Sequence, residues 1–166
     1  MTTITVHGDT VTLSGSLPAV GQSLPSVTVT TNDLDDVALA DLAGSRLVLN
    51  IFPSVDTGVC ASQLRAFNKA AAGLDNTTVI GVSKDLPFAQ ARFCGAEGIE
   101  NVATYSAFRS DFGDAFGVTM TDGPLRGLLA RAVIVTDADG RVVYSELVPE
   151  VGQEPDYEAA LAALDA

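Results

Sequence analysis

Cys60 and Cys94 are the side chains of this 166-residue chain best suited to redox chemistry. Cys60 follows the apolar run 46–52 and the turn-rich loop 53–58, and beyond it apolar residues recur at helical spacing. Cys60 is therefore predicted in the first turn of a helix, where free N–H groups and the helix dipole favour a thiolate. A thiolate is the form that attacks a peroxide oxygen and becomes a sulfenic acid.

An ordinary buried cysteine explains the position of Cys60 equally well from spacing alone. Cys60 shares a helical stripe with Leu64 and Phe67, and cysteine often packs as a small apolar residue. The preceding loop favours the reactive interpretation. Thr57, three positions earlier, is predicted to direct its hydroxyl toward the sulfur, and Pro53 to shape the loop and shield the site.

The small number of other reactive side chains excludes several kinds of site. His7 is the only histidine, which argues against a Cys–His pair of the protease type. Two cysteines and one histidine are also too few for a four-ligand structural zinc site of the usual kind. Activation of Cys60 must therefore come from the helix start, from hydrogen bonds and from a cation.

Length and composition predict one globular domain over residues 1–166. Hydrophobic residues make up 47% of the chain, which is enough for a core, and the formal net charge of -12 disfavours nucleic-acid and anionic-membrane partners. The apolar runs are far shorter than the roughly 20 residues a bilayer requires. The N-terminus shows no signal peptide, so the prediction is a cytoplasmic protein in which a disulfide is transient rather than structural.

Strands and helices are predicted to alternate along most of the chain. Residues 3–13 alternate in the manner of a β-hairpin, and Ala138-Asp139-Gly140 reads as the turn of a second hairpin. The remaining predicted strands are 27–31, 46–52, 77–83 and 102–105, and the predicted helices begin near 58, 85, 111 and 155. This order predicts an α/β fold of thioredoxin-like type with an N-terminal β-hairpin extension.

The second cysteine is predicted near the end of the second helix. Asp85 is the predicted N-cap of that helix, with Pro87 in its first turn, and the helix is predicted to end around Cys94 and Gly95. A cysteine at such a position is more often packing than chemistry. A reactive Cys60 elsewhere in the chain reverses that preference.

Pro53, Thr57 and Cys60 form the pattern P-x-x-x-T-x-x-C. This pattern resembles the signature of the peroxiredoxins, and several longer segments resemble in particular their bacterial thiol peroxidase branch. The resemblance covers essentially the whole chain, and the segments that carry it are FPSVDTGVC (52–60), SKDLPFAQARFCGAEG (83–98), DGPL (122–125), LARAVIV (129–135) and EPDYEAA (154–160).

The resemblance implies a thiol-dependent peroxidase that reduces hydrogen peroxide and organic hydroperoxides. Cys60 is then the peroxidatic cysteine and Cys94 the resolving one, and the two form an intramolecular disulfide. Thioredoxin is the implied reductant and a homodimer the implied assembly. The route needs no metal, haem or flavin. Because a disulfide requires Cα atoms within about 7 Å, local unwinding around one or both cysteines is expected to be part of the cycle.

Arg131 is the predicted cation of the site. It opens a strand of buried character, where an unpaired charge is costly, and it starts the motif Arg-Ala-Val-Ile-Val that the resemblance matches. Arg131 is expected to stabilise the Cys60 thiolate and to orient the peroxide. Thr57 and the backbone N–H of Cys60 are expected to add hydrogen bonds at the same centre.

Two other functions remain open on the residues alone. A thiol–disulfide oxidoreductase would share the fold and a reactive cysteine, but it would normally show C-x-x-C, and here Thr57 stands where the first cysteine would be. A non-enzymatic redox-sensing or chaperone-like protein would bind partners according to the oxidation state of Cys60 and Cys94, with negligible peroxide turnover.

Overall fold

The computed structural model describes residues 2–42 and 44–165, so Met1 and Ala166, the two ends of the predicted domain, lie outside the described residues. The chain forms strands and helices in the order β1 (Thr3–Val6), β2 (Asp9–Thr12), β3 (Thr28–Thr30), β4 (Asp36–Ala38), β5 (Arg46–Ile51), α1 (Gly58–Ala71), β6 (Thr77–Ser83), α2 (Pro87–Glu97), β7 (Val102–Ser106), α3 (Phe112–Ala115), β8 (Ala132–Thr136), β9 (Val142–Leu147) and α4 (Tyr157–Ala162). Short 3-10 helices cover Leu39–Leu42 and Ala163–Asp165.

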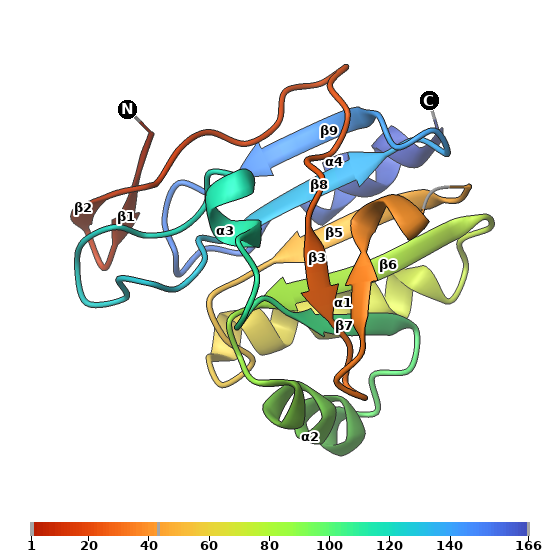
Figure 1. Cartoon of the computed structure of the whole chain (residues 1–166), viewed down its shortest axis with the longest axis horizontal. Coiled ribbons are helices and arrows are strands. Elements are labelled where there is room, and N and C mark those ends of the chain that lie inside the picture. The colour runs from red at the N-terminus through yellow and green to blue at the C-terminus, as the bar shows by residue number, and fades with distance from the viewer. Residues whose placement is uncertain (1, 43, 166) are drawn as a thin grey trace.

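A seven-stranded mixed sheet forms the centre of the molecule, and β1 and β2 form a separate antiparallel hairpin beside it (Figure 1). The strand order is β4-β3-β7-β6-β5-β8-β9. Strands β5, β6 and β7 run parallel, whereas β8 is antiparallel to β5 and β9 antiparallel to β8. The predicted α/β class, the N-terminal hairpin and the second hairpin are therefore confirmed.

Each face of the sheet is covered by a different set of elements. Successive residues of a strand point to opposite faces, so Val48 packs on one side of β5 and Leu47 and Leu49 on the other. The Val48 side is covered by α1, α2 and α4, and it contains both cysteines. The Leu47 side is covered by the β1–β2 hairpin, the first 3-10 helix and α3. The sheet thus separates two apolar clusters, and both cysteines lie in the same one.

The topology brings several loops together at one edge of the sheet. Ile51 of β5 pairs with Val82 of the parallel β6 and with Ala132 of the antiparallel β8. The end of β5, the end of β6 and the start of β8 therefore lie side by side. The loop before α1, the loop before α2 and Arg131 all leave the sheet at that edge.

The start of α1 and the span of β6 agree with prediction, but two features of α2 differ. The helix continues through Gly95 to Glu97 and ends at Gly98, whose backbone is left-handed at φ 66°. Gly98 donates its backbone N–H to the Cys94 carbonyl, so glycine does end this helix, three residues later than predicted. Gly95 stays helical because a single glycine weakens a helix without breaking it.

The predicted N-cap of α2 is wrong as well. The N-cap residue is Leu86, and it makes no side-chain capping bond. The carboxylate of Asp85 instead accepts hydrogen bonds from Ser54, Val55 and Ser83. Partners from the neighbouring loop therefore outcompete the helix N-terminus for this side chain.

Two further differences lie outside the cysteine-bearing helices. Strand β4 and the 3-10 helix after it were not predicted, because the segment 35–42 shows only a short, half-buried pattern. The last helix begins at Tyr157 rather than at Pro155, and the Asp156 carboxylate caps it by accepting a hydrogen bond from the Ala159 N–H at 3.0 Å.

Candidate active site

Cys60 lies in the first turn of α1 with no exposed surface. The first hydrogen bond of the helix runs from the Ala61 N–H to the Thr57 carbonyl at 3.0 Å. The N–H groups of residues 58–60 therefore have no carbonyl partner within the helix. The sulfur shares its apolar surroundings with Leu64 and Phe67, as the helical stripe predicts. Both alternatives raised by the sequence therefore describe this side chain, since Cys60 is buried and also sits at a helix start.

The guanidinium of Arg131 lies against the Cys60 sulfur, with 3.2 Å between Nη1 and Sγ. Arg131 is 2% exposed, and its Nε and Nη2 both donate to the Val151 carbonyl, at 3.0 and 2.8 Å. Nη1 also donates to Gln63 Oε1 at 2.8 Å. The predicted partnership of Arg131 with Cys60 is therefore present in the geometry.

Arg131 takes part in none of the three ion pairs found among residues 2–42 and 44–164. Its neighbours are a carbonyl, an amide and the sulfur, which are all neutral while Cys60 is a thiol. An isolated buried charge is costly. Of the groups that Arg131 contacts, the Cys60 sulfur is the one able to carry a negative charge.

Gln63 was not identified from the sequence, although its position carried a signal. It lies three residues after Cys60 and is fully buried, so a polar side chain interrupts the apolar face of α1. Its Nε2 donates to Asn50 Oδ1 at 3.4 Å, and Asn50 donates in turn to the Ile80 carbonyl at 3.3 Å. These two hydrogen bonds fix the Gln63 amide so that its Oε1 faces Arg131.

Pro53 and Thr57 line a pocket of about 220 Å³ that Arg131, the partner of Cys60, also lines. Pro53 is buried and Thr57 is exposed at the N-cap of α1. The Thr57 hydroxyl donates to the Ser54 carbonyl at 3.2 Å, rather than to the sulfur as predicted. The other lining residues are mostly small or apolar: His7, Ser54, Gly58, Val59, Leu125, Leu128, Arg131, Val151 and Gly152.

Cys94 lies on α2, half-buried in the same apolar cluster as Cys60. Both cysteines are free, so this geometry is that of the dithiol. The Cys94 sulfur is 3.6 Å from Thr104 Oγ1. Burial raises the pKa of the Cys94 thiol, and the Thr104 hydrogen bond offsets part of that effect. Cys94 is therefore held protonated in the dithiol form.

Two ion pairs connect α2 with the elements that carry Cys60. Arg92 of α2 contacts Asp56, in the loop before α1, at 3.2 Å, and Arg65 of α1 contacts Glu97 of α2 at 3.0 Å. All four side chains are well exposed, so each pair contributes little to stability.

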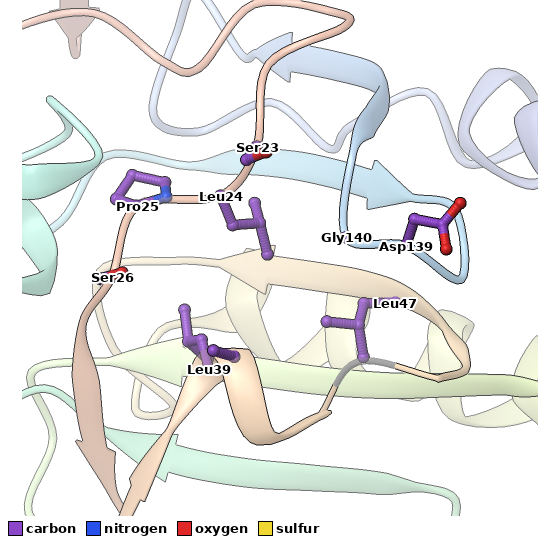
Figure 2. A pocket seen from close by; sticks show the side chains of 9 residues that line it. Ser23, Leu24, Pro25, Ser26, Leu39, Leu47, Asp139 and Gly140 are labelled. Carbon is purple, nitrogen blue, oxygen red and sulfur yellow. The ribbon is translucent and has the colours of Figure 1, made fainter.

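A second hollow lies away from the cysteines, between the segment 23–26 and the turn that joins β8 to β9 (Figure 2). It measures about 150 Å³, and the side chains of Leu24, Leu39 and Leu47 line it. None of its lining residues is a cysteine, a histidine or a cation, so it offers no comparable chemistry.

Across the described part of the chain, no cluster of three or more histidine, cysteine or acidic side chains is placed to hold a metal ion. A search of the same residues for membrane-spanning helices finds none of sufficient length and apolarity.

Comparison with known proteins identifies the family. The redoxin family model matches residues 19–161. Thiol peroxidase of Mycobacterium tuberculosis is 57% identical over the full length of both chains, and that of Corynebacterium glutamicum is 57% identical over 96% of each. A peroxiredoxin-like protein from Aquifex aeolicus superposes with a TM-score of 0.92 at 39% identity, covering 98% of this chain and 96% of its own. The fold is thioredoxin-like, as predicted, and the chain belongs to the redoxin family, among its thiol peroxidases.

Proposed function

We propose that this chain is a thiol-dependent peroxidase in which Cys60 attacks the peroxide and Cys94 completes the cycle. The observation that carries the proposal is the buried Arg131 guanidinium, 3.2 Å from the Cys60 sulfur and without a carboxylate partner among residues 2–42 and 44–164. A group so placed stabilises negative charge on sulfur before the reaction and negative charge on oxygen during it. The full-length relationship to thiol peroxidases supports the same assignment.

In the first step the Cys60 thiolate attacks the terminal oxygen of a hydroperoxide, ROOH. The S–O bond forms as the O–O bond breaks, giving Cys60–SOH and an alkoxide that takes up a proton to leave as ROH. The sulfur loses two electrons and the peroxide gains them. Arg131 is placed to stabilise the leaving oxygen, and the free N–H groups at the start of α1 face the same developing charge.

In the second step the Cys94 thiol condenses with the Cys60 sulfenic acid. A Cys60–Cys94 disulfide forms and water leaves, which accounts for the oxygen and both protons. The sulfurs are carried by two separate helices, α1 and α2, so the segments around one or both cysteines are expected to rearrange before they meet. Reduction by the dithiol of thioredoxin then returns both cysteines to the free form.

The pocket that Arg131 lines supports organic hydroperoxides as substrates alongside hydrogen peroxide. Val59, Leu125 and Leu128 give it an apolar wall, and Arg131 adds a cation to its lining. Such a wall desolvates and holds an alkyl group while the peroxide oxygens reach the cation. Pro53 is the proposed shield of the site, and Thr57, at its rim, is the proposed hydrogen-bonding partner of the bound peroxide.

The chain is further proposed to act in the cytoplasm as a homodimer, without nucleic-acid or membrane partners. The strongly negative net charge of -12 supports the last point. Three large apolar side chains are exposed around the start of α2, namely Leu86, Phe88 and Phe108. An apolar surface of this kind supports a protein partner, here a second copy of the chain.

The test is to follow peroxide consumption by the purified protein with thioredoxin as reductant. Wild type is expected to consume hydrogen peroxide and a bulky alkyl hydroperoxide, and Cys60→Ser neither. Cys94→Ser is expected to retain a single round of Cys60 oxidation and to lose thioredoxin-dependent turnover. A Cys60→Ser protein that still reduced peroxide would overturn the assignment, and mass spectrometry showing only intermolecular disulfides would overturn the intramolecular route.

The alternatives make different predictions in the same assay. A thiol–disulfide oxidoreductase would reduce protein disulfides faster than it reduces peroxide. A redox-sensing or chaperone-like protein would bind partners according to the Cys60–Cys94 oxidation state with negligible turnover. The cation beside Cys60 favours the peroxidase over both, because neither alternative needs to stabilise a leaving alkoxide.

A further inference from the structure

Asp85 lies where the loop before α1 and the loop before α2 meet. Strands β5 and β6 are parallel neighbours, so the residues that follow them leave the sheet at the same edge. The first loop, residues 52–57, leads to Cys60, and the second, residues 84–86, leads to the helix that carries Cys94. Asp85 is half-buried between these two loops.

The carboxylate of Asp85 binds the Cys60 loop through both of its oxygens. The Ser54 hydroxyl donates to Oδ1 at 2.7 Å, and the Val55 backbone N–H donates to Oδ2 at 2.8 Å. Hydrogen bonds to an ionised acceptor are stronger than those between neutral groups. Ser54 and Val55 stand between Pro53 and Thr57, so Asp85 holds the part of the loop that shapes the pocket.

The same carboxylate is also connected to α2. The Ser83 hydroxyl donates to Asp85 Oδ2 at 2.6 Å, and Gln90 Nε2 donates to the Ser83 oxygen at 3.1 Å. Gln90 lies one turn before Cys94 on the helix and is fully buried. A continuous hydrogen-bonded path, called the Asp85 network below, thus runs from Ser54 and Val55 through Asp85 and Ser83 to Gln90.

The Gln90 end of the network is incompletely satisfied. Gln90 Nε2 has two acceptors, Ser83 Oγ and the Tyr105 carbonyl, but Gln90 Oε1 is buried and has no hydrogen-bond partner within the part of the chain that the structure describes. An unpaired buried acceptor disfavours the packed state, since it regains hydrogen bonds when water reaches it. The network is therefore strong where it holds the Cys60 loop and weak where it holds the Cys94 helix.

We propose that Asp85 is a positioning residue that holds the Cys60 loop and the Cys94 helix in the arrangement suited to peroxide attack, and thereby sets how fast the two sulfurs can meet. This inference rests on the proposed peroxidase function. In the dithiol Cys60 has no exposed surface and Cys94 is half-buried on another helix. Because a disulfide requires Cα atoms within about 7 Å, we expect the loop or the helix to leave its place before the disulfide forms, and the Asp85 network joins these two segments.

The stability of the Asp85 network then sets the relative rates of two competing reactions of the Cys60 sulfenic acid. Condensation with the Cys94 thiol gives the disulfide and water. Reaction with a second hydroperoxide gives Cys60–SO₂H and ROH, which removes the enzyme from the cycle. Tight binding of the loop favours peroxide attack in both rounds, and release favours the disulfide. Weakening the network is therefore expected to speed resolution and to reduce overoxidation.

The test compares Asp85→Asn with Asp56→Asn. Asparagine at 85 keeps the size of the side chain but replaces one acceptor oxygen with an NH₂ donor. Either the Ser54 hydroxyl, or the Val55 N–H together with the Ser83 hydroxyl, then loses the oxygen that accepts from it. Asp56→Asn makes the same change in the Cys60 loop, to which the Asp85 carboxylate binds, and it also removes a link to α2, the exposed ion pair with Arg92. It is therefore a matched control for charge and location.

Stopped-flow oxidation followed by acid quenching gives the rate of disulfide formation, and mass spectrometry gives the sulfinic acid formed at high peroxide. Asp85→Asn is expected to form the disulfide roughly ten- to a hundredfold faster, the effect of losing one hydrogen bond to a charged acceptor, and to accumulate less sulfinic acid. Asp56→Asn is expected to change the rate by less than about twofold, because exposed ion pairs contribute little. Disulfide formation that is unchanged or slower in Asp85→Asn would overturn the proposal.

Hydrogen exchange of the reduced protein separates this proposal from the peroxidase assignment, because it requires no turnover. Asp85→Asn is expected to speed exchange in peptides covering 54–60 and 87–97, and Asp56→Asn is not. Unchanged exchange in both segments would overturn the proposal even if the protein reduces peroxide. If Asp85→Asn does not fold, Ser54→Ala, which removes one donor only, is expected to shift exchange and disulfide formation in the same direction by a smaller factor, and no shift would again overturn it.

Discussion

Arg131 determines the chemistry available at Cys60, because it brings a permanent positive charge into a site without bulk water. The charge is tolerated because the Val151 carbonyl accepts two of its N–H groups and Gln63 accepts a third. These neutral partners orient the guanidinium without neutralising it. Of the groups that Arg131 contacts, the Cys60 sulfur is the one that can become negative.

Replacing Arg131 is expected to slow the oxidation of Cys60. Arg131→Met, which keeps the length and removes the charge, is expected to lower the second-order rate constant by about 10²–10³, the usual effect of losing one donor to a developing oxyanion. Arg131→Lys keeps a charge but cannot bind Val151 with two donors, so an intermediate loss is expected. Stopped-flow measurement of Cys60 oxidation checks both.

Arg109→Met is the control for loss of a positive charge, because Arg109 forms an ion pair with Asp36 in a different part of the sheet. Its rate constant should match that of wild type. An Arg131→Met protein that reacts within threefold of wild type would show that the cation is structural rather than catalytic.

The N-terminal hairpin reaches the active site through the segment that follows β9. Thr5 donates its N–H to the Pro149 carbonyl and accepts the N–H of Val151 at its own carbonyl. The Val151 carbonyl is the one that holds Arg131. Glu150, which lies between Pro149 and Val151, binds the hairpin by accepting hydrogen bonds from the Thr5 hydroxyl and the His7 backbone N–H. The hairpin therefore takes part in placing the guanidinium.

Glu150→Gln is expected to weaken the docking of this hairpin in a pH-dependent way. The hydrogen bond from the Thr5 hydroxyl, together with backbone N–H groups, lowers the pKa of Glu150 in the folded protein. A carboxylate of lowered pKa adds stability above its unfolded pKa, about 4.3, and loses it as the pH falls through the lower folded value. Glu150→Gln should therefore lower Tm by a few degrees at pH 7, and the difference should close toward pH 3.

Thermal unfolding of both proteins across that pH range gives the measurement. Glu158→Gln on the exposed side of α4 removes an equal charge without these hydrogen bonds, and it should show no such closing difference. A Tm difference for Glu150→Gln that is the same at pH 3 and pH 7 would contradict the linkage.

The surface of the whole molecule is strongly acidic but is interrupted by an apolar patch. The patch is defined by Leu86, Phe88 and Phe108, of which Phe88 is 65% exposed. Leu86 and Phe88 lie at the start of α2, and the Ser106 hydroxyl, two residues before Phe108, donates to the Asp85 carbonyl. The three side chains thus belong to one region of the surface, next to the Cys94 helix.

Sedimentation velocity at 0.15 M salt, where self-repulsion of the charge is largely screened, is expected to show a species of twice the 17.1 kDa of one chain. Phe88→Ser is expected to shift the protein toward monomer. Val20→Ser alters an apolar side chain of equal exposure, 66%, elsewhere on the surface, and should leave the dimer intact. A monomeric wild type would contradict the homodimer, and a dimeric Phe88→Ser would place the interface elsewhere.

The elements and the two candidate redox cysteines were readable from local patterns. A branched apolar run followed by a turn-rich loop places Cys60 at a helix start, and these residues form β5 and the first turn of α1. The buried character of the strand after Arg131 likewise predicted a constrained cation. Such features depend on neighbours within a few positions, so hydrophobic periodicity and turn chemistry are sufficient to find them.

Contacts between distant segments were decided by the tertiary structure. The parallel pairing of β5 and β6 brings Ser54 within reach of Asp85, 31 positions away, and the side chain that looked like a helix cap binds that loop instead. Backbone groups such as the Val151 carbonyl leave no trace in residue type, although they hold Arg131 in place. The two cysteines of the predicted pair are sequence features, but their environments, one beside a cation and one buried as a protonated thiol, exist only once the sheet has formed.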